Sequence, residues 1–326
     1  MSVNVYEIVT NRILQDLEKG IIPWRKPWSG LAVKYLGRRT HDETRIQHLA
    51  VSRATGRPYS LLNQWLLGKP GEWATFKQVR DAGGTVRKGE KSSICVFWKF
   101  LEVERKDADG KPVCDPVTGE ILHEQVPYLQ YYNVFHVATQ CDGITPRKSG
   151  DVTTVRTVVD DPGTPVPADR TWADIESADA IVRDYIARSG VKLTEKAGED
   201  RAYYAPYLDA VTVPARAQFD SAGEFYSTLF HELTHSTGHS SRLDRFSGAG
   251  SHAFGSDNYS KEELVAEIGA SCLNAIAGVE TPATFKNSVA YIQNWSERFK
   301  RDPKLIVSAS AKAERAVGYI LGEVDA

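Results

Sequence analysis

Two histidines and a glutamate in the second half of the chain have the spacing of a metal site. Residues 230–235 read FHELTH and contain the pattern HExxH. On a helix, His231 and His235 lie one turn apart on the same face, so both imidazoles can bind one metal ion. Glu232 can accept a proton from a water molecule that the metal activates for attack on a carbonyl carbon. The pattern indicates a zinc-dependent metallopeptidase with Glu232 as the catalytic acid/base.

The residues around this pattern predict the helix that such a site requires. Ser221 and Glu224 form a capping box that would begin a helix, and Gly238 would end it. Its apolar face consists of Phe225, Leu229 and Leu233. The alternative is a helix whose two histidines are simply exposed to solvent.

The third metal ligand is expected downstream, because a catalytic zinc usually has three protein ligands and one open position. A metzincin would place a histidine at position 241, but this chain has Ser241, and His239 comes two residues too early. In residues 260–267, SKEELVAE, Glu263 and Glu267 lie one helical turn apart. One of them can bind the metal while the other accepts a hydrogen bond from a ligand histidine.

We prefer Glu263 as the third ligand, in a gluzincin-like arrangement. Glu267 and His239 remain as alternative ligands or as groups around the site. Glu263 could instead occupy the third position of a second capping box, one that begins at Ser260. A strand predicted at residues 209–214, DAVTVP, would stand beside the metal and offer an edge to an extended peptide, which favours a peptide substrate.

The composition is that of a soluble globular protein. The chain has 326 residues, of which 41% are hydrophobic and 25% charged. This length favours about two domains, and the composition excludes collagen-like, coiled-coil and wholly disordered proteins. No apolar run reaches the ~20 residues of a membrane span, and the first residues do not resemble a signal peptide. Cys95, Cys114, Cys141 and Cys272 form no CxxC pair, as expected for reduced thiols in a cytoplasmic protein.

The near-zero net charge of −2 conceals an uneven distribution. Residues 1–100 contain 17 Lys and Arg against 8 Asp and Glu, a balance of +9, whereas residues 101–326 have a balance of −11. Five of the seven tryptophans also lie in the first hundred residues. A basic, tryptophan-rich first part and an acidic remainder indicate two modules with different partners.

Periodicity and turn residues divide the chain in the same way. In the first module we expect helices at 3–19, 61–67 and 75–82, strands at 94–103 and 129–137, and an exposed excursion at 107–120. In the second we expect a helix at 172–188, a strand near 210–213 and three further helices. The predicted fold class is α+β with two domains: residues 1–141, a linker at 142–171, and a mainly helical domain at 172–326.

The first module has the composition of a surface that binds single-stranded DNA. The segments PWRKPW (23–28), TGRPY (55–59) and VRKGEK (86–91) combine cations with aromatic rings. Single-stranded nucleic acid needs cations along its phosphates and flat rings on which bases stack. The candidate contacts are Trp24, Arg25, Lys26, Trp28, Arg57, Tyr59, Asn63, Lys77, Arg87, Lys88 and Lys91. The alternative is that the tryptophans belong to the core and the charges to an ordinary surface.

Eight segments, in the same order along nearly the whole chain, resemble the ArdC-type antirestriction proteins of conjugative plasmids. The N-terminal part of this family is related to the plasmid primase TraC. The segments are LEKGIIPWRKPW, TGRPYSLLNQWLL, WATFK, GGTVRKGEKSSICVFW, YNVFHVATQCDGI, YYAPYLDAVTVP, FHELTHSTGHSSRLDR and YSKEELVAEIGASCL.

The resemblance implies an N-terminal domain that binds single-stranded DNA and a C-terminal zincin-like metallopeptidase domain. Together they would protect incoming plasmid DNA from host restriction. The metal ligands would fall on His231, His235 and Glu263, and the ion would be Zn²⁺, with Mn²⁺ or Co²⁺ as alternatives. Glu232 would be the catalytic acid/base.

Two functions of different classes fit these residues. In the first, the DNA-binding module localises a peptidase that cleaves a host protein. In the second, a non-catalytic protein coats single-stranded DNA and its metal domain is structural. A metal-dependent nuclease is less well supported, since nucleases usually gather carboxylates around Mg²⁺.

Overall fold

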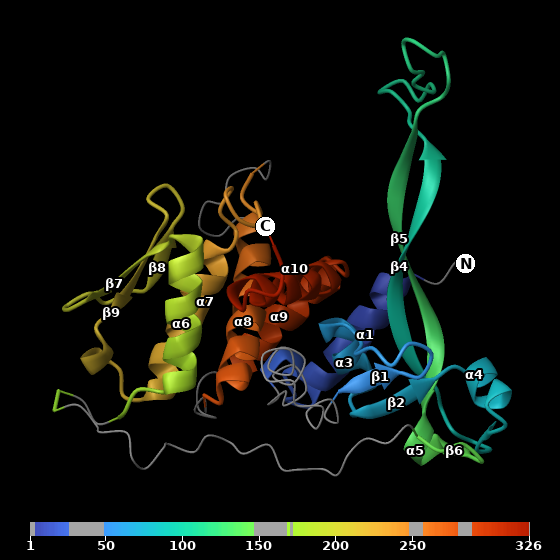
Figure 1. Ribbon diagram of the computed structural model, residues 1–326, viewed down its shortest axis with the longest axis horizontal. Coiled ribbons are helices and arrows are strands. Elements are labelled where there is room, and N and C mark those ends of the chain that lie inside the picture. Colours follow the sequence, from blue (N-terminus) through green and yellow to red (C-terminus); the bar gives the residue numbers. More distant parts are fainter. Residues whose placement is uncertain are drawn as a thin grey trace.

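A computed structural model describes residues 4–25, 49–146, 168–169, 172–247, 257–279 and 289–325. The two ends of the molecule in Figure 1 carry the sheets, and helices fill the space between them. In the first half the elements are α1 (Val5–Glu18), the 3-10 helix η1 (Pro23–Arg25), β1 (Ala50–Ser52), α3 (Leu61–Leu67), β2 (Gly71–Ala74), α4 (Phe76–Asp81), β3 (Thr85–Val86), β4 (Ser93–Glu104), β5 (His123–His136), α5 (Val137–Gln140) and β6 (Cys141–Asp142).

The helices predicted in the first half are confirmed. The Asn4 side chain caps α1, whose apolar positions Val9, Ile13 and Leu17 are buried. Thr75 begins α4 with a capping box to Gln78. Local capping and spacing were therefore enough to locate these helices.

One four-stranded sheet has the order β1-β2-β5-β4. Strands β4 and β5 form a long antiparallel hairpin, paired in register from Ser93↔Val134 to Glu104↔His123. We call this hairpin the arm; it projects away from the rest of the molecule (Figure 1). Strand β5 begins at His123, six residues before the predicted start at 129. The prediction was late because the first residues of the strand include His123, Glu124, Gln125 and Pro127, which are typical of a loop. The predicted excursion at 107–120 lies at the tip of the arm.

The described part of the second half contains a small sheet, five α-helices and one 3-10 helix. Its elements are α6 (Glu176–Ser189), β7 (Lys192–Lys196), β8 (Tyr203–Ala205), β9 (Ala210–Pro214), the 3-10 helix η3 (Arg216–Gln218), α7 (Ala222–Ser236), α8 (Asp257–Ala277), α9 (Val289–Arg301) and α10 (Leu305–Ile320). Among the described residues four α-helices follow the strands rather than the predicted three. The polar strand β7 and the three-residue strand β8 escaped prediction.

The sheet order β7-β9-β8 corrects one expectation about the site. Strand β9 is parallel to β7 and antiparallel to β8, so it lies in the centre of the sheet. We expected this strand to offer its edge to a peptide, and that expectation is wrong because both of its edges are already paired. The edge strand that contacts α7 is β8.

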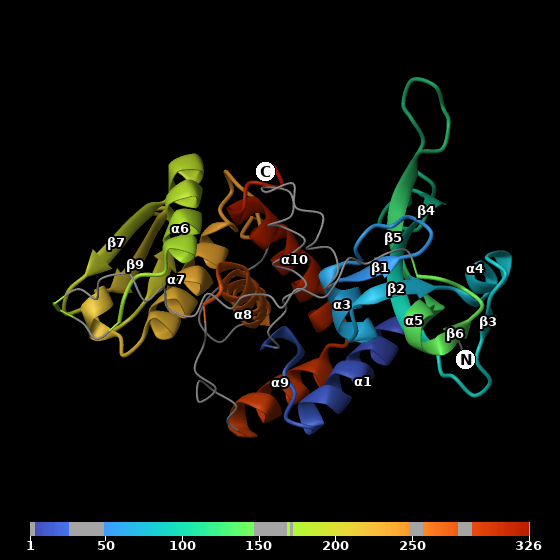
Figure 2. The same ribbon diagram turned by 60° about the horizontal axis from the view of Figure 1, so that its bottom comes forward.

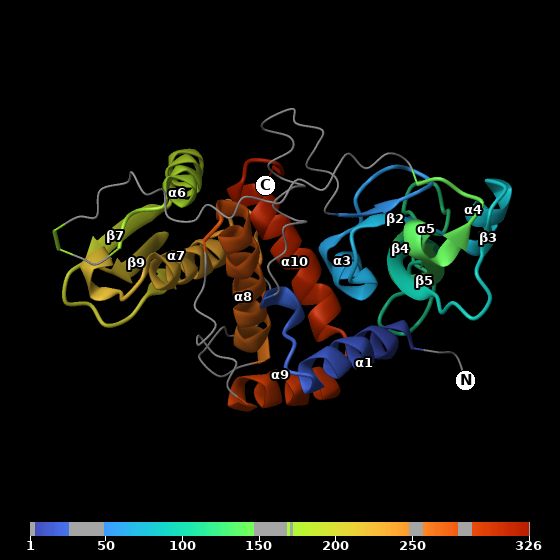
Figure 3. The ribbon, with the colours of Figure 1, turned by 90° about the horizontal axis from the view of Figure 1, so that it is seen from below.

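The two halves of the sequence share one hydrophobic core. Helix α1 lies beside α9, as Figures 2 and 3 both show. The Thr10 hydroxyl donates to the carbonyl of Pro303 at 2.9 Å. Trp24, which has no exposed surface, packs edge-on against Trp295 and Phe299. The first helix and η1 therefore pack with helices of the second half, and the domain limits at 141 and 172 stay predictions.

Candidate metal centre

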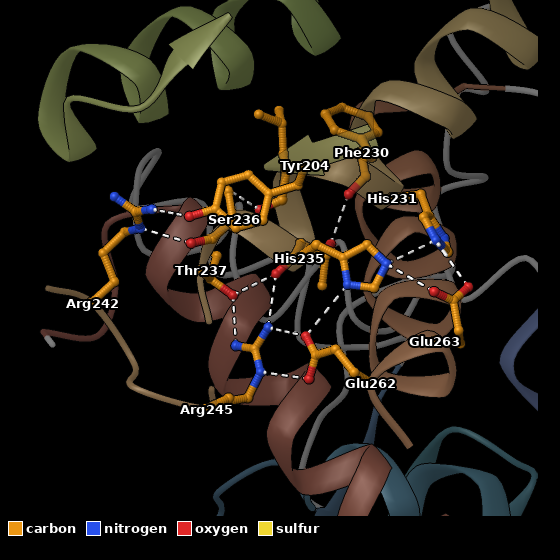
Figure 4. Close-up of polar contacts among 12 residues, drawn as sticks. Tyr204, Phe230, His231, His235, Ser236, Thr237, Arg242, Arg245, Glu262 and Glu263 are labelled. Atoms are coloured by element: carbon orange, nitrogen blue, oxygen red, sulfur yellow. Dashed lines mark hydrogen bonds and ion pairs between the residues drawn. The ribbon is translucent and has the colours of Figure 1, made fainter. Parts of the chain in front are cut away.

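Helix α7 presents the HExxH residues as the sequence predicted. The Ser221 side chain accepts a hydrogen bond from the Glu224 amide at 3.2 Å and begins the helix. The apolar residues Phe225, Leu229 and Leu233 have no exposed surface and fix the orientation of the helix against the core. His231 and His235 consequently project from the same face, toward α8 (Figure 4).

The donor atoms of three side chains converge at this face. The Nε2 atoms of His231 and His235 are 3.1 Å apart, and Glu263 on α8 lies 3.4 Å from His235 Nε2 and 3.6 Å from His231 Nε2. Ligands about 2.0–2.1 Å from a tetrahedral zinc are themselves about 3.3 Å apart. The separations fit a divalent ion at this position. Within the described ranges, no other set of three His, Cys, Asp or Glu side chains could hold one.

The structure separates Glu263 from the alternatives considered for it. Helix α8 begins at Asp257, so Ser260 lies inside the helix and the capping-box interpretation of Glu263 is wrong. Glu267 and His239 do not belong to the converging group. The His239 ring instead contacts the Ser241 hydroxyl at 2.8 Å. Glu263 is therefore the third candidate ligand that the geometry supports.

A second carboxylate, which sequence reasoning missed, lies on the other side of His235. Glu262 is 8% exposed and its Oε1 lies 3.5 Å from His235 Nδ1. Arg245 donates to both oxygens of Glu262, at 2.6 and 3.1 Å. Arg245 is itself held by the Thr237 hydroxyl and the Thr234 carbonyl (Figure 4). A glutamate directly before Glu263 was visible in the sequence, but the contact with Arg245 depends on the tertiary structure.

The carboxylates around the histidines favour positive charge at the site. Burial alone would lower the pKa of His235, but Glu262, Glu263 and the charge of Glu232 raise it to about 10. Burial alone would raise the pKa of Glu263, but contacts with His231 and His235 hold that pKa well below its usual range. For Glu262, His235 and Arg245 likewise outweigh burial and lower the pKa. A cation is thus the species this group of side chains stabilises.

Close packing of α7 against α8 sets the distance between the histidines and Glu263. Gly269 on α8 faces Thr234 on α7, and a methyl group added at Gly269 would lie 2.5 Å from Thr234 Cγ2 and 2.7 Å from its Oγ1. Thr234 has no room to turn away, since it is fully buried and its hydroxyl donates to the Phe230 carbonyl at 2.7 Å. A residue without a side chain is required at this crossing.

A buried arginine ties the small sheet to the end of α7. Arg242 donates to the carboxylate of Asp209 between β8 and β9, to the Tyr204 hydroxyl at 3.2 Å, and to the Ser236 carbonyl at 2.8 Å. Tyr204 in turn donates to Asp209 at 2.8 Å. These bonds fix strand β8 relative to the histidine helix.

The structure divides the candidate DNA contacts into buried and exposed groups. Trp24, Tyr59 and Asn63 are buried, so the expectation that they contact DNA is wrong. Trp24 belongs to the core, and the Asn63 side chain exchanges two hydrogen bonds with the backbone of Val96, each 2.8 Å long. Tyr59 packs in a cluster with Trp73 and Cys95. The alternation of rings and cations in the sequence could not distinguish core rings from exposed ones.

The remaining candidates in the described residues are cations. Arg57, Lys77, Arg87, Lys88 and Lys91 are exposed. Arg87 already pairs with Asp142 at 2.8 Å, which raises the arginine's pKa. Lys26, Trp28 and the side chain of Arg25 lie outside the described residues. Sequence reasoning missed the aromatic residues that are exposed in this half, most of which lie on β4 and β5, with Phe76 on α4.

Family models match both halves of the chain. Residues 3–135 match the N-terminal domain of the anti-restriction factor ArdC, and residues 179–312 match a zincin-like metallopeptidase. No helix in the described ranges combines the length and apolar character that crossing a bilayer requires.

Relatives match across the whole chain. Two Escherichia coli proteins named DNA primase TraC are 33% and 34% identical over 97% of this chain, which spans only 20% and 27% of their lengths. The uncharacterized protein y4eC of Sinorhizobium fredii (strain NBRC 101917 / NGR234) is 30% identical, with 97% of this chain matching 91% of y4eC.

Crystal structures of the antirestriction protein ArdC from plasmid R388, one metal-free and one with Mn(II), extend the match to three dimensions. They are 32% and 31% identical, with TM-scores of 0.62 and 0.63, and the match covers 98% of each chain. The predicted α+β fold with two domains, one of them zincin-like, is confirmed. The chain belongs to the ArdC family of antirestriction proteins.

Proposed function

We propose that this protein is a divalent-metal-dependent peptidase coupled to a module that binds single-stranded DNA, and that it protects incoming DNA from restriction. One observation carries the peptidase half of the proposal: the donor atoms of His231, His235 and Glu263 converge at the separations that a tetrahedral ion needs. The Mn(II)-bound relative and the zincin-like family model support the binding of a divalent metal. Zn²⁺ is the proposed ion because two imidazoles and one carboxylate suit it.

The side chains of the site have distinct tasks in this proposal. His231, His235 and Glu263 hold the ion, which supplies a Lewis acid that polarises a peptide carbonyl and acidifies water. Glu232, buried next to His231, accepts the proton of the attacking water and delivers it to the departing amine. Glu262, itself fixed by Arg245, holds the His235 ring in the orientation that directs Nε2 toward the ion.

The substrate in this proposal is an extended segment of a host protein. Strand β8 forms the edge of the small sheet and contacts α7. An extended peptide that pairs with β8 would add a strand to the sheet and pass over the histidine helix. The hydrogen bonds of Arg242 to Tyr204 and to the end of α7 keep this edge rigid for such pairing.

The DNA-binding half of the proposal rests on the excess of cations in residues 1–100 and on the exposure of Arg57, Lys77, Lys88 and Lys91. The match of residues 3–135 to the N-terminal domain of ArdC and the similarity of the chain to TraC also support DNA binding. The DNA bound by this module would be a single strand of the incoming plasmid. The two halves together would bring a peptidase to that strand.

Metal removal tests the peptidase half. Protein stripped with a chelator is expected to lose cleavage of a mixed peptide library, and stoichiometric Zn²⁺ or Mn²⁺ is expected to restore it. Mass spectrometry of the library gives the cleavage sites. His235→Ala should bind no stoichiometric metal by calorimetry and cleave nothing after reloading. Equal cleavage by stripped and reloaded protein would contradict a metal-dependent peptidase.

Glu262→Gln tests the positioning of His235. The variant is expected to bind Zn²⁺ about 10- to 100-fold more weakly, because the amide supports the imidazole less well than a carboxylate fixed by Arg245. Isothermal titration with Zn²⁺ measures the change. Glu176→Gln, at an exposed position on α6, is the matched control and should bind as the wild type does. Wild-type affinity in Glu262→Gln would show that the Glu262 contact does not tune the site.

A further inference from the structure

The arm carries a concentration of exposed aromatic side chains. Phe97, Trp98 and Phe100 on β4 are 40%, 43% and 62% exposed, and Tyr128 and Tyr131 on β5 are 48% and 39% exposed. All five lie in the half of the arm nearer the body, which we call the near half and define as residues 93–101 and 126–134. No comparable cluster of exposed rings occurs elsewhere in the described ranges.

Both faces of the near half are apolar, which is unusual for a two-stranded hairpin. Directly paired residues point to the same face, so the register places Phe97 and Tyr128 on one face and Trp98 and Phe100 on the other. The base of the arm is covered on both faces: Val96 and Leu129 are buried in the main core, and Cys95 and Val134 in a second cluster. One side of the Trp98 ring faces Tyr6 on α1, with ring centroids 6.5 Å apart, and the ring remains 43% exposed. An isolated hairpin is marginally stable in water, and exposed apolar patches of this kind mark interaction sites. The arm therefore presents a binding surface.

The charges along the arm indicate what binds there. Residues 91–101 and 125–136 contain Lys91 and Lys99 but no Asp or Glu. Glu90, at the foot of the arm, accepts a hydrogen bond from Gln140, and the other nearby acidic residues, Glu102, Glu104 and Glu124, lie beyond the near half. The near half therefore suits a polyanion, and the far half repels one. Lys99 lies directly opposite Tyr128, so a cation and a ring share one face.

We propose that single-stranded DNA lies along the near half of the arm, with bases stacked on Trp98, Phe100 and neighbouring rings and phosphates near Lys91 and Lys99. This inference rests on the proposed DNA-binding function and assigns it to a surface. Rings beside cations match single strands, whose unpaired bases expose faces for stacking; a duplex conceals those faces. The rings of the arm thus take the role that the sequence had suggested for the buried Trp24 and Tyr59.

The test compares two double variants in the full-length protein. Trp98→Ala with Phe100→Ala removes two rings from the arm, and each ring lost should weaken oligo(dT) binding about 5- to 150-fold. Phe76→Ala with Tyr207→Ala removes two rings that are 53% and 99% exposed elsewhere, and it should leave affinity unchanged. Fluorescence anisotropy of labelled oligo(dT) measures affinity. Circular dichroism should show that both variants fold, because these side chains are exposed.

A third variant locates the contact. The other described tryptophans are buried, and a Trp28→Phe background removes the one that lies outside the described residues. In that background, quenching of tryptophan emission by unlabelled oligo(dT) should come mainly from Trp98. Trp98→Phe should keep most of the affinity, since a ring remains for stacking, but should lose most of the quenching.

The outcomes separate this inference from the proposed function. If the wild type binds oligo(dT) and the arm variant binds it equally well, the arm is not the contact. That result would overturn the inference and leave the proposed DNA binding in place. No binding by the wild type would overturn both. If the arm variant retained DNA affinity but changed the molecular mass measured by light scattering, the arm would be a contact between copies and the inference would be wrong.

Discussion

A Glu232→Gln variant is expected to bind Zn²⁺ as the wild type does and to cleave peptides about 10²- to 10⁴-fold more slowly. The amide keeps the shape of the side chain but cannot accept the proton of the attacking water. Glu232 does not belong to the group of donor atoms that converge between α7 and α8, so metal affinity should not change. Calorimetry gives the metal affinity, and single-turnover cleavage of the best library peptide gives the rate.

This variant also separates the two functions considered for the chain. Protection of DNA in a cell that carries a restriction system should fall with the cleavage rate if proteolysis is the mechanism. Full protection by Glu232→Gln, with metal still bound, would instead support a protein that coats single-stranded DNA. His231→Ala, which should lose both metal and cleavage, is the control for metal dependence.

Gly269→Val is expected to lower the free energy of unfolding by about 3 kcal/mol, at the upper end of overpacking effects. A methyl at position 269 already lies within 2.7 Å of two Thr234 atoms, and valine adds two more carbons at the same crossing. Relief requires α8 to move away from α7, which also moves Glu263 away from the histidines. We therefore expect a lower thermal midpoint together with weaker Zn²⁺ binding.

A double-mutant cycle tests whether the clash itself is the cause. Gly269→Ala is the milder change, and combining it with Thr234→Ala removes the two atoms that the new methyl would meet most closely. The two substitutions should be strongly coupled, so that the double variant is more stable than the sum of the single effects predicts. Additive effects would show that the contact with Thr234 is not the cause of any loss of stability in Gly269→Ala.

Local signals located the elements that carry the site. The capping residue Ser221 and the apolar spacing of α1 and α7 are short-range features, and the structure contains both helices where these features place them. The same reasoning could not identify Glu262 as a partner of His235, because Arg245 reaches it from a separate segment. Nor could it place β9 in the centre of its sheet, since the polar strand β7 has no distinctive pattern.

The tryptophans show most clearly what the sequence alone cannot predict, namely which rings are exposed. Trp24 and Trp98 both lie close to lysines in a basic segment, yet the first has no exposed surface and the second is 43% exposed. The difference arises because Trp295 and Phe299, about 270 residues later, cover Trp24. Composition predicts that a module contains rings for stacking, but only long-range packing decides which rings remain available.

The packing of α1 against the last helices has a consequence for how the protein is made. Thr10 contacts Pro303, 293 residues further along the chain. At about 5–20 residues per second, the ribosome takes roughly 15–60 s to cover that interval. Throughout this time α1 and Trp24 lack the surface that buries them. The apolar face of α1 therefore stays without these partners until residues 289–320 emerge, and the two halves of the sequence complete their shared core together.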